Sequence, residues 1–374
     1  MRKYLLSFAA AFALLCTLPL VCSAQPDISA KGAVLLSGTS GRVVAAYNER
    51  ERLPMASTTK IMTALLLAES GDLSKEIVTT REMVTVEGSS MGLLTGDRVT
   101  YHDLLYGMLL ASGNDAANTT AICLGGSTAG FAAQMNAKAA ALGLSDTHFV
   151  TPSGLDDPAH YTTAYDLARL AAYAMENPVF REAASAKTAV LCYGNPPYRR
   201  SLTNHNKLLS FYDGCIGVKT GFTKKSGRCL VSAAEREGGM LVAVTLNDGN
   251  DWADHAVLLD YGFSLMETRT LSADLPETVR IAGGTKTAAA CGAESVSLTL
   301  LPEEFDLIET AVYLTPLCFA PVEKGEVVGR VDYCVGEKVL ATQEIYAAET
   351  VLPAEPQPAK RETVWDALRR LLKM

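Results

Sequence analysis

The stretch from Thr58 to Ala68 constrains the fold more than any other part of the chain. Its apolar side chains lie on nearly every side of a helix, namely Ile61, Met62, Ala64, Leu65, Leu66 and Leu67. A helix that is apolar all round is buried in a core and does not lie on a surface. It also contains Lys60, and an unpaired lysine inside a core is costly. We therefore predict a central buried helix whose lysine has a partner or a function.

The length and composition predict two folded domains of ordinary globular character. The chain has 374 residues, which is long for one domain. Hydrophobic residues make up 48% and charged residues 20%, so disorder of the whole chain is not expected. The formal net charge of -8 argues against a general nucleic-acid-binding surface, and we expect no nucleic-acid partner.

The N-terminus has the pattern of a signal peptide that spans residues 1–24. Arg2 and Lys3 give a positive start, Leu5–Val21 is apolar, and Cys22–Ala24 is a small-residue cleavage site. We expect cleavage near the end of this triplet, and therefore export. An uncleaved membrane anchor is the alternative, but the apolar run is short and ends in small residues. Cleavage removes two of the nine cysteines, and the odd remainder contains no C-x-x-C pattern, so we expect free thiols.

Residues 25–270 mix helical and strand patterns and are predicted to form one α+β domain. Apolar runs flank a Ser-Gly-Thr-Ser-Gly turn near the start of this segment and a Glu-Gly-Gly turn near its end. Both ends of the segment therefore contribute strands to one sheet. The expected strands lie at 33–36, 42–47, 228–234 and 240–246, and the expected helices at 58–68, 104–110 and 163–175.

Residues 271–352 are predicted to form a small all-β domain. Val296–Leu300 alternates between apolar and polar side chains with a period of two, as a half-buried strand does. Residues 327–335 and 338–346 predict two strands about a Gly336-Glu337 turn. No long helical period appears in this segment.

Residues 360–374 are predicted to form an amphipathic helix after a stiff proline-rich linker at 353–359. One face is apolar and carries Trp365, and the other face is basic, which is the composition of a helix that lies in a membrane interface. It is too short to cross a bilayer, which needs ~20 apolar residues. We expect this helix to hold the protein at the outer face of the cytoplasmic membrane. The alternative is a helix docked on its own protein. The apolar face comprises Val364, Trp365, Leu368, Leu371 and Leu372.

Three short polar motifs occur once each, in the order Ser57-Thr-Thr-Lys60, Ser112-Gly-Asn114 and Lys219-Thr-Gly221. Ser57 begins the buried helix, and Lys60 lies one turn further on the same face. A serine hydroxyl becomes a good nucleophile when a base takes its proton, and burial lowers the pKa of a lysine so that it can be that base. An N-cap serine followed by a surface lysine is the alternative, which the apolar surroundings of Lys60 disfavour.

The other two motifs offer polar groups to a substrate. Ser112 and Asn114 lie in a loop between predicted helices, where polar side chains can reach a cleft. Ser112 can relay a proton, and Asn114 can hold a substrate amide. Lys219 and Thr220 on an edge strand can bind a carboxylate, while Gly221 lets a substrate backbone approach closely. A simple turn and an ordinary polar strand are the alternatives when each motif is taken alone.

Together with their flanking residues, these motifs resemble those of the low-molecular-weight penicillin-binding proteins of the D-alanyl-D-alanine carboxypeptidase type (peptidase S11 family). The resemblance covers nearly all of the chain after the signal peptide. It implies a penicillin-binding-protein or serine β-lactamase-like fold, in which helices and a helical subdomain flank an antiparallel sheet, followed by the small β domain and the terminal helix. The segments that carry it are 54–60, 112–117, 151–156, 160–167, 204–208 and 217–223.

The resemblance also implies a role for each motif residue. Ser57 forms the acyl-enzyme, Lys60 is its general base, and Ser112 and Asn114 complete the proton path and position the substrate. Lys219 and Thr220 bind the terminal carboxylate, and Gly221 lies beside the substrate backbone. The backbone N–H groups of Ser57 and Phe222 form the oxyanion hole. Phe222 stands where some relatives carry histidine, so side-chain contacts with the substrate differ there.

The implied substrates are peptidoglycan stem peptides that end in D-Ala-D-Ala, and β-lactam antibiotics are the implied covalent inhibitors. The balance between carboxypeptidase and endopeptidase action stays open. A serine β-lactamase shares the three motifs, but class A enzymes need a glutamate for deacylation, and no glutamate occurs between Glu87 and Glu176. A non-catalytic cell-wall-binding protein is the remaining alternative, which the intact Ser57 and Lys60 disfavour.

Two other signals do not predict chemistry. Residues 88–92 match G-x-S-x-G, but no helix is expected to follow, so a nucleophile elbow is improbable. The five histidines lack ligand spacing, and we expect neither a metal nor a cofactor.

Overall fold

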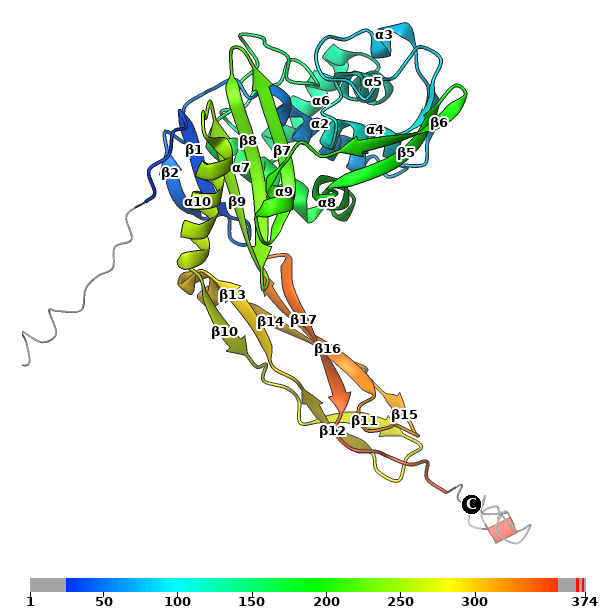
Figure 1. Cartoon of the computed structure of the whole chain (residues 1–374). Coiled ribbons are helices and arrows are strands. Elements are labelled where there is room, and N and C mark those ends of the chain that lie inside the picture. The colour runs from blue at the N-terminus through cyan, green and yellow to red at the C-terminus, as the bar shows by residue number, and fades with distance from the viewer. Residues whose placement is uncertain (1–24, 356–367, 370–371, 373–374) are drawn as a thin grey trace, which may run out of the picture. The chain divides into compact units, whose positions relative to one another are not determined.

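The computed structural model describes residues 25–355, 368–369 and 372, which Figure 1 shows in colour. The predicted signal peptide and most of the predicted linker and terminal helix lie outside these residues. In the part of the chain that is described, no helix is both long and apolar enough to cross a membrane. The chain divides into two compact units. The first contains Val43–Ala233 and Val242–Phe263 with the chain up to Leu36, and the second contains Ser264 onward with Ser37–Arg42 and Ala234–Leu241.

A five-stranded sheet with the order β2-β1-β9-β8-β7 runs through the first unit, and β7 is one of its edges. Strand β9 is buried at all eight positions. Helix α10 packs on it, because His255 of α10 contacts Ser232 of β8 and Thr245 of β9. The four predicted strands are confirmed. The bounds are β1 Gly32–Ser37, β2 Val43–Tyr47, β7 Cys215–Thr223, β8 Gly227–Arg236, β9 Gly239–Leu246 and α10 Asp251–Ser264.

The predicted buried helix is confirmed at the centre of the helical part of this unit (Figure 1). Its first turn is a 3₁₀ turn, η1 (Ala56–Thr59), and the α-helix α2 (Lys60–Glu69) continues from it. Helix α2 packs against α4, α5 and α7, which explains why it is apolar on nearly every side. The predicted helices at 104–110 and 163–175 are α4 and α7. The other helices are α3 Arg81–Val84, α4 Tyr101–Leu109, α5 Asn114–Gly125, α6 Thr128–Ala141, α7 Ala164–Glu176, α8 Pro178–Ser185 and α9 Leu208–Phe211.

A second sheet of the first unit was not anticipated from the sequence. Its four strands have the order β3-β4-β5-β6, and the long hairpin of β5 and β6 is in register from Thr188–Thr203 to Gly194–Pro197. Exposed and buried positions do not alternate cleanly along β6, so a period of two is hard to see there. The bounds are β3 Glu76–Val78, β4 Arg98–Thr100, β5 Thr188–Gly194 and β6 Pro197–Thr203.

The second unit contains the predicted β-rich segment. Strands β16 and β17 form a hairpin, and Val335 pairs with Lys338 beside Gly336, whose φ is +59°. A six-stranded sheet has the order β14-β16-β17-β12-β11-β15, and β10 pairs with β13. The hydrophobic core of the second unit draws on both sheets and includes Val279, Leu298, Val331, Tyr333 and Ile345. The bounds are β10 Glu267–Leu271, β11 Thr278–Ala282, β12 Ala288–Ala293, β13 Val296–Leu300, η2 Pro302–Leu307, β14 Glu309–Leu314, β15 Cys318–Phe319, β16 Val327–Val335 and β17 Lys338–Ala347.

Candidate active site

Ser57 and Lys60 lie together at the start of the central helix. Ser57 is in the 3₁₀ turn η1 and Lys60 is the first residue of α2, so one helical turn brings their side chains to the same face. Lys60 Nζ lies 2.9 Å from Ser57 Oγ. The residue before the serine, Ala56, has a φ of +47°, a conformation that non-glycine residues rarely adopt. The backbone at the serine is therefore held in place by its surroundings.

Lys60 is fully buried and has three hydrogen-bond partners. Besides Ser57 Oγ, its amine contacts Asn114 Oδ1 at 2.7 Å and the backbone oxygen of Ser153 at 2.8 Å. Burial lowers the pKa of Lys60 well below its usual value, and the positive charge of Lys219 lowers it further, while Asp115 raises it. A lysine with a lowered pKa can lose its proton and act as a base. The arrangement can therefore take the proton of the Ser57 hydroxyl.

Ser112 lies in the loop between α4 and α5, and Asn114 is the first residue of α5. Ser112 has a φ of +56°, and its side chain lines the same cavity as Ser57. Asn114 begins α5 and uses both ends of its amide, since Oδ1 accepts from Lys60 and Nδ2 donates to the oxygen of Glu87 at 2.6 Å. This pair of bonds connects the amine of Lys60 to the backbone at Glu87.

Lys219, Thr220 and Gly221 lie on the edge strand β7, as the sequence predicted. Lys219 is buried, and burial lowers the pKa of its amine to about 7. A Cβ atom added at Gly221 would lie 3.0 Å from the nitrogen of Ser57 and 3.1 Å from the oxygen of Met55. Only glycine lets the strand pass this close to the nucleophile.

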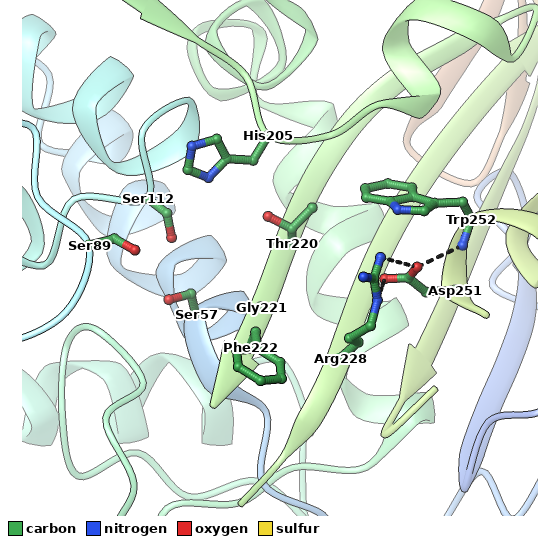
Figure 2. Close-up of a pocket in the computed structure, with 10 residues that line it drawn as sticks. All are labelled: Ser57, Ser89, Ser112, His205, Thr220, Gly221, Phe222, Arg228, Asp251 and Trp252. Atoms are coloured by element: carbon green, nitrogen blue, oxygen red, sulfur yellow. Dashed lines mark hydrogen bonds and ion pairs between the residues drawn. The ribbon is translucent and has the colours of Figure 1, made fainter. Parts of the chain in front are cut away.

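These elements line an open cavity of about 480 Å³. Figure 2 shows the side chains around it. The sequence-predicted residues Ser57, Ser112, Thr220, Gly221 and Phe222 line it, and the side chain of Phe222 is 66% exposed. The remaining predicted residues, Lys60, Asn114 and Lys219, are buried next to these lining residues. All eight predicted site residues therefore gather around one cavity.

Five further lining residues were missed by the sequence reasoning, namely Ser89, His205, Arg228, Asp251 and Trp252. Arg228 of β8 donates from Nε and Nη2 to the two carboxylate oxygens of Asp251, at 3.0 and 2.6 Å, on the side of the cavity away from Ser112 (Figure 2). The pKa of His205 is lowered by burial first and then by Lys219. Ser89 and His205 lie in the motif segments 88–92 and 204–208, and Arg228 begins the predicted strand 228–234, but none of the three had been given a role.

The segment 151–160 packs against the start of the central helix and contacts both Lys60 and Thr59. It supplies the Ser153 oxygen that Lys60 contacts, and a Cβ atom at Gly154 would lie 1.8 Å from the oxygen of Ala56. His160 Nδ1 accepts the N–H of Val150 at 2.9 Å, so Nε2 carries the proton and donates to Thr59 Oγ1 at 2.8 Å. Burial lowers the pKa of His160 to about 4, which keeps the ring neutral.

Comparisons with known proteins match both parts of the chain. The model of the D-alanyl-D-alanine carboxypeptidase family, Peptidase S11, matches residues 21–250. The model of the C-terminal domain of penicillin-binding protein 5 matches residues 269–352. The chain is 32% identical over 337 residues to the D-alanyl-D-alanine carboxypeptidase DacF of Bacillus subtilis (strain 168). The matched region covers 87% of this chain and 86% of DacF.

Two solved structures are similar over most of the chain. The D-alanyl-D-alanine carboxypeptidase DacD from Francisella tularensis is 26% identical with a TM-score of 0.63, covering 90% of this chain and 96% of that one. Penicillin binding protein 5 from Haemophilus influenzae is 27% identical with a TM-score of 0.62, covering 87% of this chain and 98% of that one. The chain belongs to the S11 family of D-alanyl-D-alanine carboxypeptidases.

Proposed function

We propose that this D-alanyl-D-alanine carboxypeptidase removes the terminal D-alanine of peptidoglycan stem peptides through an acyl-enzyme on Ser57. The observation that carries this proposal is the contact of 2.9 Å between Lys60 Nζ and Ser57 Oγ, in a site where the lysine is fully buried. The hydroxyl is the nucleophile and the lysine is the base that burial has made available.

The first chemical step forms the acyl-enzyme. Ser57 Oγ attacks the carbonyl carbon of the penultimate D-alanine while its proton passes to Lys60 Nζ. The C–N bond then breaks, and the leaving amine of the terminal D-alanine receives a proton from Lys60, with Ser112 as the relay. Water next attacks the ester and gives a proton to Lys60 Nζ, which passes it to Ser57 Oγ as the shortened peptide leaves. General acid–base catalysis of this kind contributes typically 10²–10⁴-fold to a rate.

The remaining predicted residues bind and orient the peptide. Lys219 and Thr220 bind the terminal carboxylate from the edge strand β7, and Gly221 lets the substrate backbone approach. The backbone N–H groups of Ser57 and Phe222 hold the carbonyl oxygen as it gains negative charge. The support for this assignment is the position of β7, since Gly221 lies against the nitrogen of Ser57.

The same hydroxyl is proposed to react with penicillin and other β-lactams, and the penicilloyl ester to be long-lived. The segment from Gly88 to Met175 contains no glutamate. The group that meets Lys60 from the loop at 151–160 is the backbone oxygen of Ser153 and not a carboxylate. A backbone oxygen is a poor base for activating a water, so this loop offers no counterpart to the glutamate of a class A β-lactamase, and slow deacylation of the penicilloyl ester is expected.

We also propose that the enzyme acts outside the cytoplasmic membrane, held at its outer face by residues 360–374. The support is compositional, since this segment combines a basic face with an apolar face that includes Trp365. Its substrate is a cell-wall peptide, so an exported and tethered enzyme would be placed beside it.

The test of the enzymatic proposal is release of D-alanine from a peptide ending in D-Ala-D-Ala. We expect the full chain to release one D-alanine per peptide, and a Ser57→Ala variant of unchanged thermal stability to release none. Penicillin consumed over many turnovers per enzyme would support a β-lactamase. Unchanged peptide release by the Ser57→Ala variant would contradict the assignment of the nucleophile.

A further inference from the structure

The segment from Glu87 to Leu93, called the wall below, is neither helix nor strand and places Ser89 at the cavity. Ser89 lines the cavity together with Ser57 and Ser112, and Figure 2 shows these three hydroxyls on the side opposite Arg228. This is the G-x-S-x-G segment that the sequence drew attention to. No helix directly follows it, as a nucleophile elbow would require, so its position beside Ser57 calls for another explanation.

The carboxylate of Asp115 accepts hydrogen bonds from this wall. Its side chain is fully buried, and a buried carboxylate is costly unless several donors satisfy it. Five donors do so, four of them from the wall. They are the N–H groups of Met91 (2.9 Å), Gly92 (3.0 Å), Leu93 (2.9 Å) and Ala116 (2.9 Å) and the hydroxyl of Ser90 (2.5 Å). One carboxylate therefore accepts four of the hydrogen bonds that hold the wall.

Asn114 and the second sheet hold the same wall from two further directions. The N–H of Asn114 donates to the oxygen of Ser89 at 2.7 Å, and a Cβ atom at Gly88, whose φ is +88°, would lie 2.7 Å from Asn114 Nδ2. From the β5–β6 hairpin, Tyr193 donates to the oxygen of Met91 at 2.6 Å, and Arg200 donates to the oxygen of Gly92, also at 2.6 Å. The wall is rigid, and it is fixed to the residue that binds Lys60.

The two adjacent serines of the wall point to different surroundings. The hydroxyl of Ser90 binds Asp115, whereas that of Ser89 has no hydrogen-bond partner among residues 25–355 and lines the cavity. The backbone of Ser89 is held in place, and its unpaired hydroxyl can bond a ligand without first giving up another partner. Across the cavity lies the edge strand β7, along which an extended peptide can pair.

We infer that the Ser89 hydroxyl hydrogen-bonds a backbone amide or carbonyl group of the stem peptide as it lies between β7 and the wall, and that Asp115 is the positioning residue for Ser89. The inference rests on the proposed function, since it takes the cavity as the peptide site. The bond is made in the bound peptide before the chemical step as well as during it. It therefore strengthens substrate binding more than it speeds the reaction.

The experiment measures release of D-alanine from a D-Ala-D-Ala peptide by the full chain and by Ser89→Ala. A neutral hydrogen bond is worth about 0.5–1.5 kcal/mol, so we expect kcat/KM to fall roughly two- to tenfold, mainly through KM. The matched comparison is Ser90→Ala, which removes a hydroxyl from the other side of the same loop and should raise KM less. Thermal stability is recorded for every variant.

The positioning role of Asp115 is tested with Asp115→Asn and the Ser89→Ala/Asp115→Asn double variant. If Asp115 acts through Ser89, the loss of the Ser89 hydroxyl should cost less in the Asp115→Asn background than in the wild type. Independent effects that multiply would contradict the positioning role.

Wild-type kinetics for Ser89→Ala would overturn the substrate contact, and so would an equal rise in KM for Ser90→Ala at unchanged stability. These outcomes are distinct from failure of the proposed function. A wild-type chain that releases no D-alanine would contradict the proposed function itself, whereas an active wild type with an unaffected Ser89→Ala variant would contradict only this inference.

Discussion

Lys219 lowers the pKa of Lys60, although the two lysines come from opposite ends of the catalytic segment. Both amines are buried, one at the start of α2 and the other on the edge strand β7. A second positive charge makes the ammonium form of Lys60 less favourable, which adds to the effect of burial. The third motif of the sequence therefore acts on the first motif as well as on the substrate.

This relationship predicts a shift in the pH dependence of acylation. In a Lys219→Gln variant the repulsion is lost, so the pKa of Lys60 rises and more alkaline conditions are needed to free its amine. We expect the acid limb of the penicillin acylation rate to move to higher pH. The control is Lys225→Gln, which removes an exposed lysine from the turn after β7. An acid limb that stays in place, or that moves to lower pH, would contradict the coupling.

The close approach of β7 to the nucleophile predicts that Gly221→Ala is far more harmful than an ordinary glycine replacement. The new Cβ atom would lie 3.0–3.1 Å from atoms of Met55, Ala56 and Ser57, so either the strand or the serine must shift. A misplacement of about 1 Å at a reacting centre costs about 10²-fold in rate, so the smaller shift expected here should lower the rate by up to about that factor. Gly249→Ala is the matched control, since nothing lies within 4 Å of its added Cβ. Equal activity of the two variants would show that this approach is unimportant.

His160 predicts a loss of stability in acid. Its pKa is about 4 in the folded chain against a usual value of 6.5, so the unfolded chain takes up a proton first as the pH falls. The free energy of unfolding should therefore decrease as the pH falls from about 6.5 to 4. The contribution of this residue is about 3 kcal/mol. His255, whose pKa burial lowers to about 3, adds a change of the same sign.

The measurement for this prediction is chemical denaturation over that pH range. A His160→Gln variant should show a shallower loss than the wild type, because one of the two buried rings is gone. The comparison variant is His102→Gln, at an exposed position, which should keep the wild-type slope. If His160→Gln also keeps that slope, His160 does not stay neutral in the folded chain.

The terminal segment predicts the location of the enzyme. Deletion of residues 360–374 removes the proposed interfacial helix and should move the protein from the membrane fraction to the soluble fraction, with D-alanine release unchanged. A full-length Trp365→Ala variant is a milder change, and a smaller share of it than of the wild type should stay in the membrane fraction. Retention of the truncated chain at the membrane would contradict the anchor.

The first motif could be predicted well because its geometry is local. Ser57 and Lys60 are three residues apart at the start of a helix, so their contact follows from helical periodicity, and the burial of Lys60 follows from its apolar neighbours. The buried helix, the first hairpin and the strands at 228–234 and 240–246 were predictable for the same reason. Their patterns depend on residues that are neighbours in the sequence.

The rest of the site depends on contacts between distant segments, which no local pattern records. The oxygen of Ser153 reaches Lys60 from 93 positions away, and it is a backbone group that any residue could supply. Arg228 and Asp251 pair across a strand and a helix, and each alone is an unremarkable charged residue. Ser89 is placed by Asp115 and by a β5–β6 hairpin that the sequence did not reveal.

The most direct test of the account is the rate at which penicillin adds to Ser57, followed by mass spectrometry of the intact protein and of its peptides. The account predicts one penicilloyl group per chain, mapped to Ser57, and a rate that falls by roughly 10²–10⁴-fold in a folded Lys60→Gln variant. An adduct on another residue, or an undiminished rate in the Lys60→Gln variant, would contradict the claim that Lys60 takes the proton of Ser57.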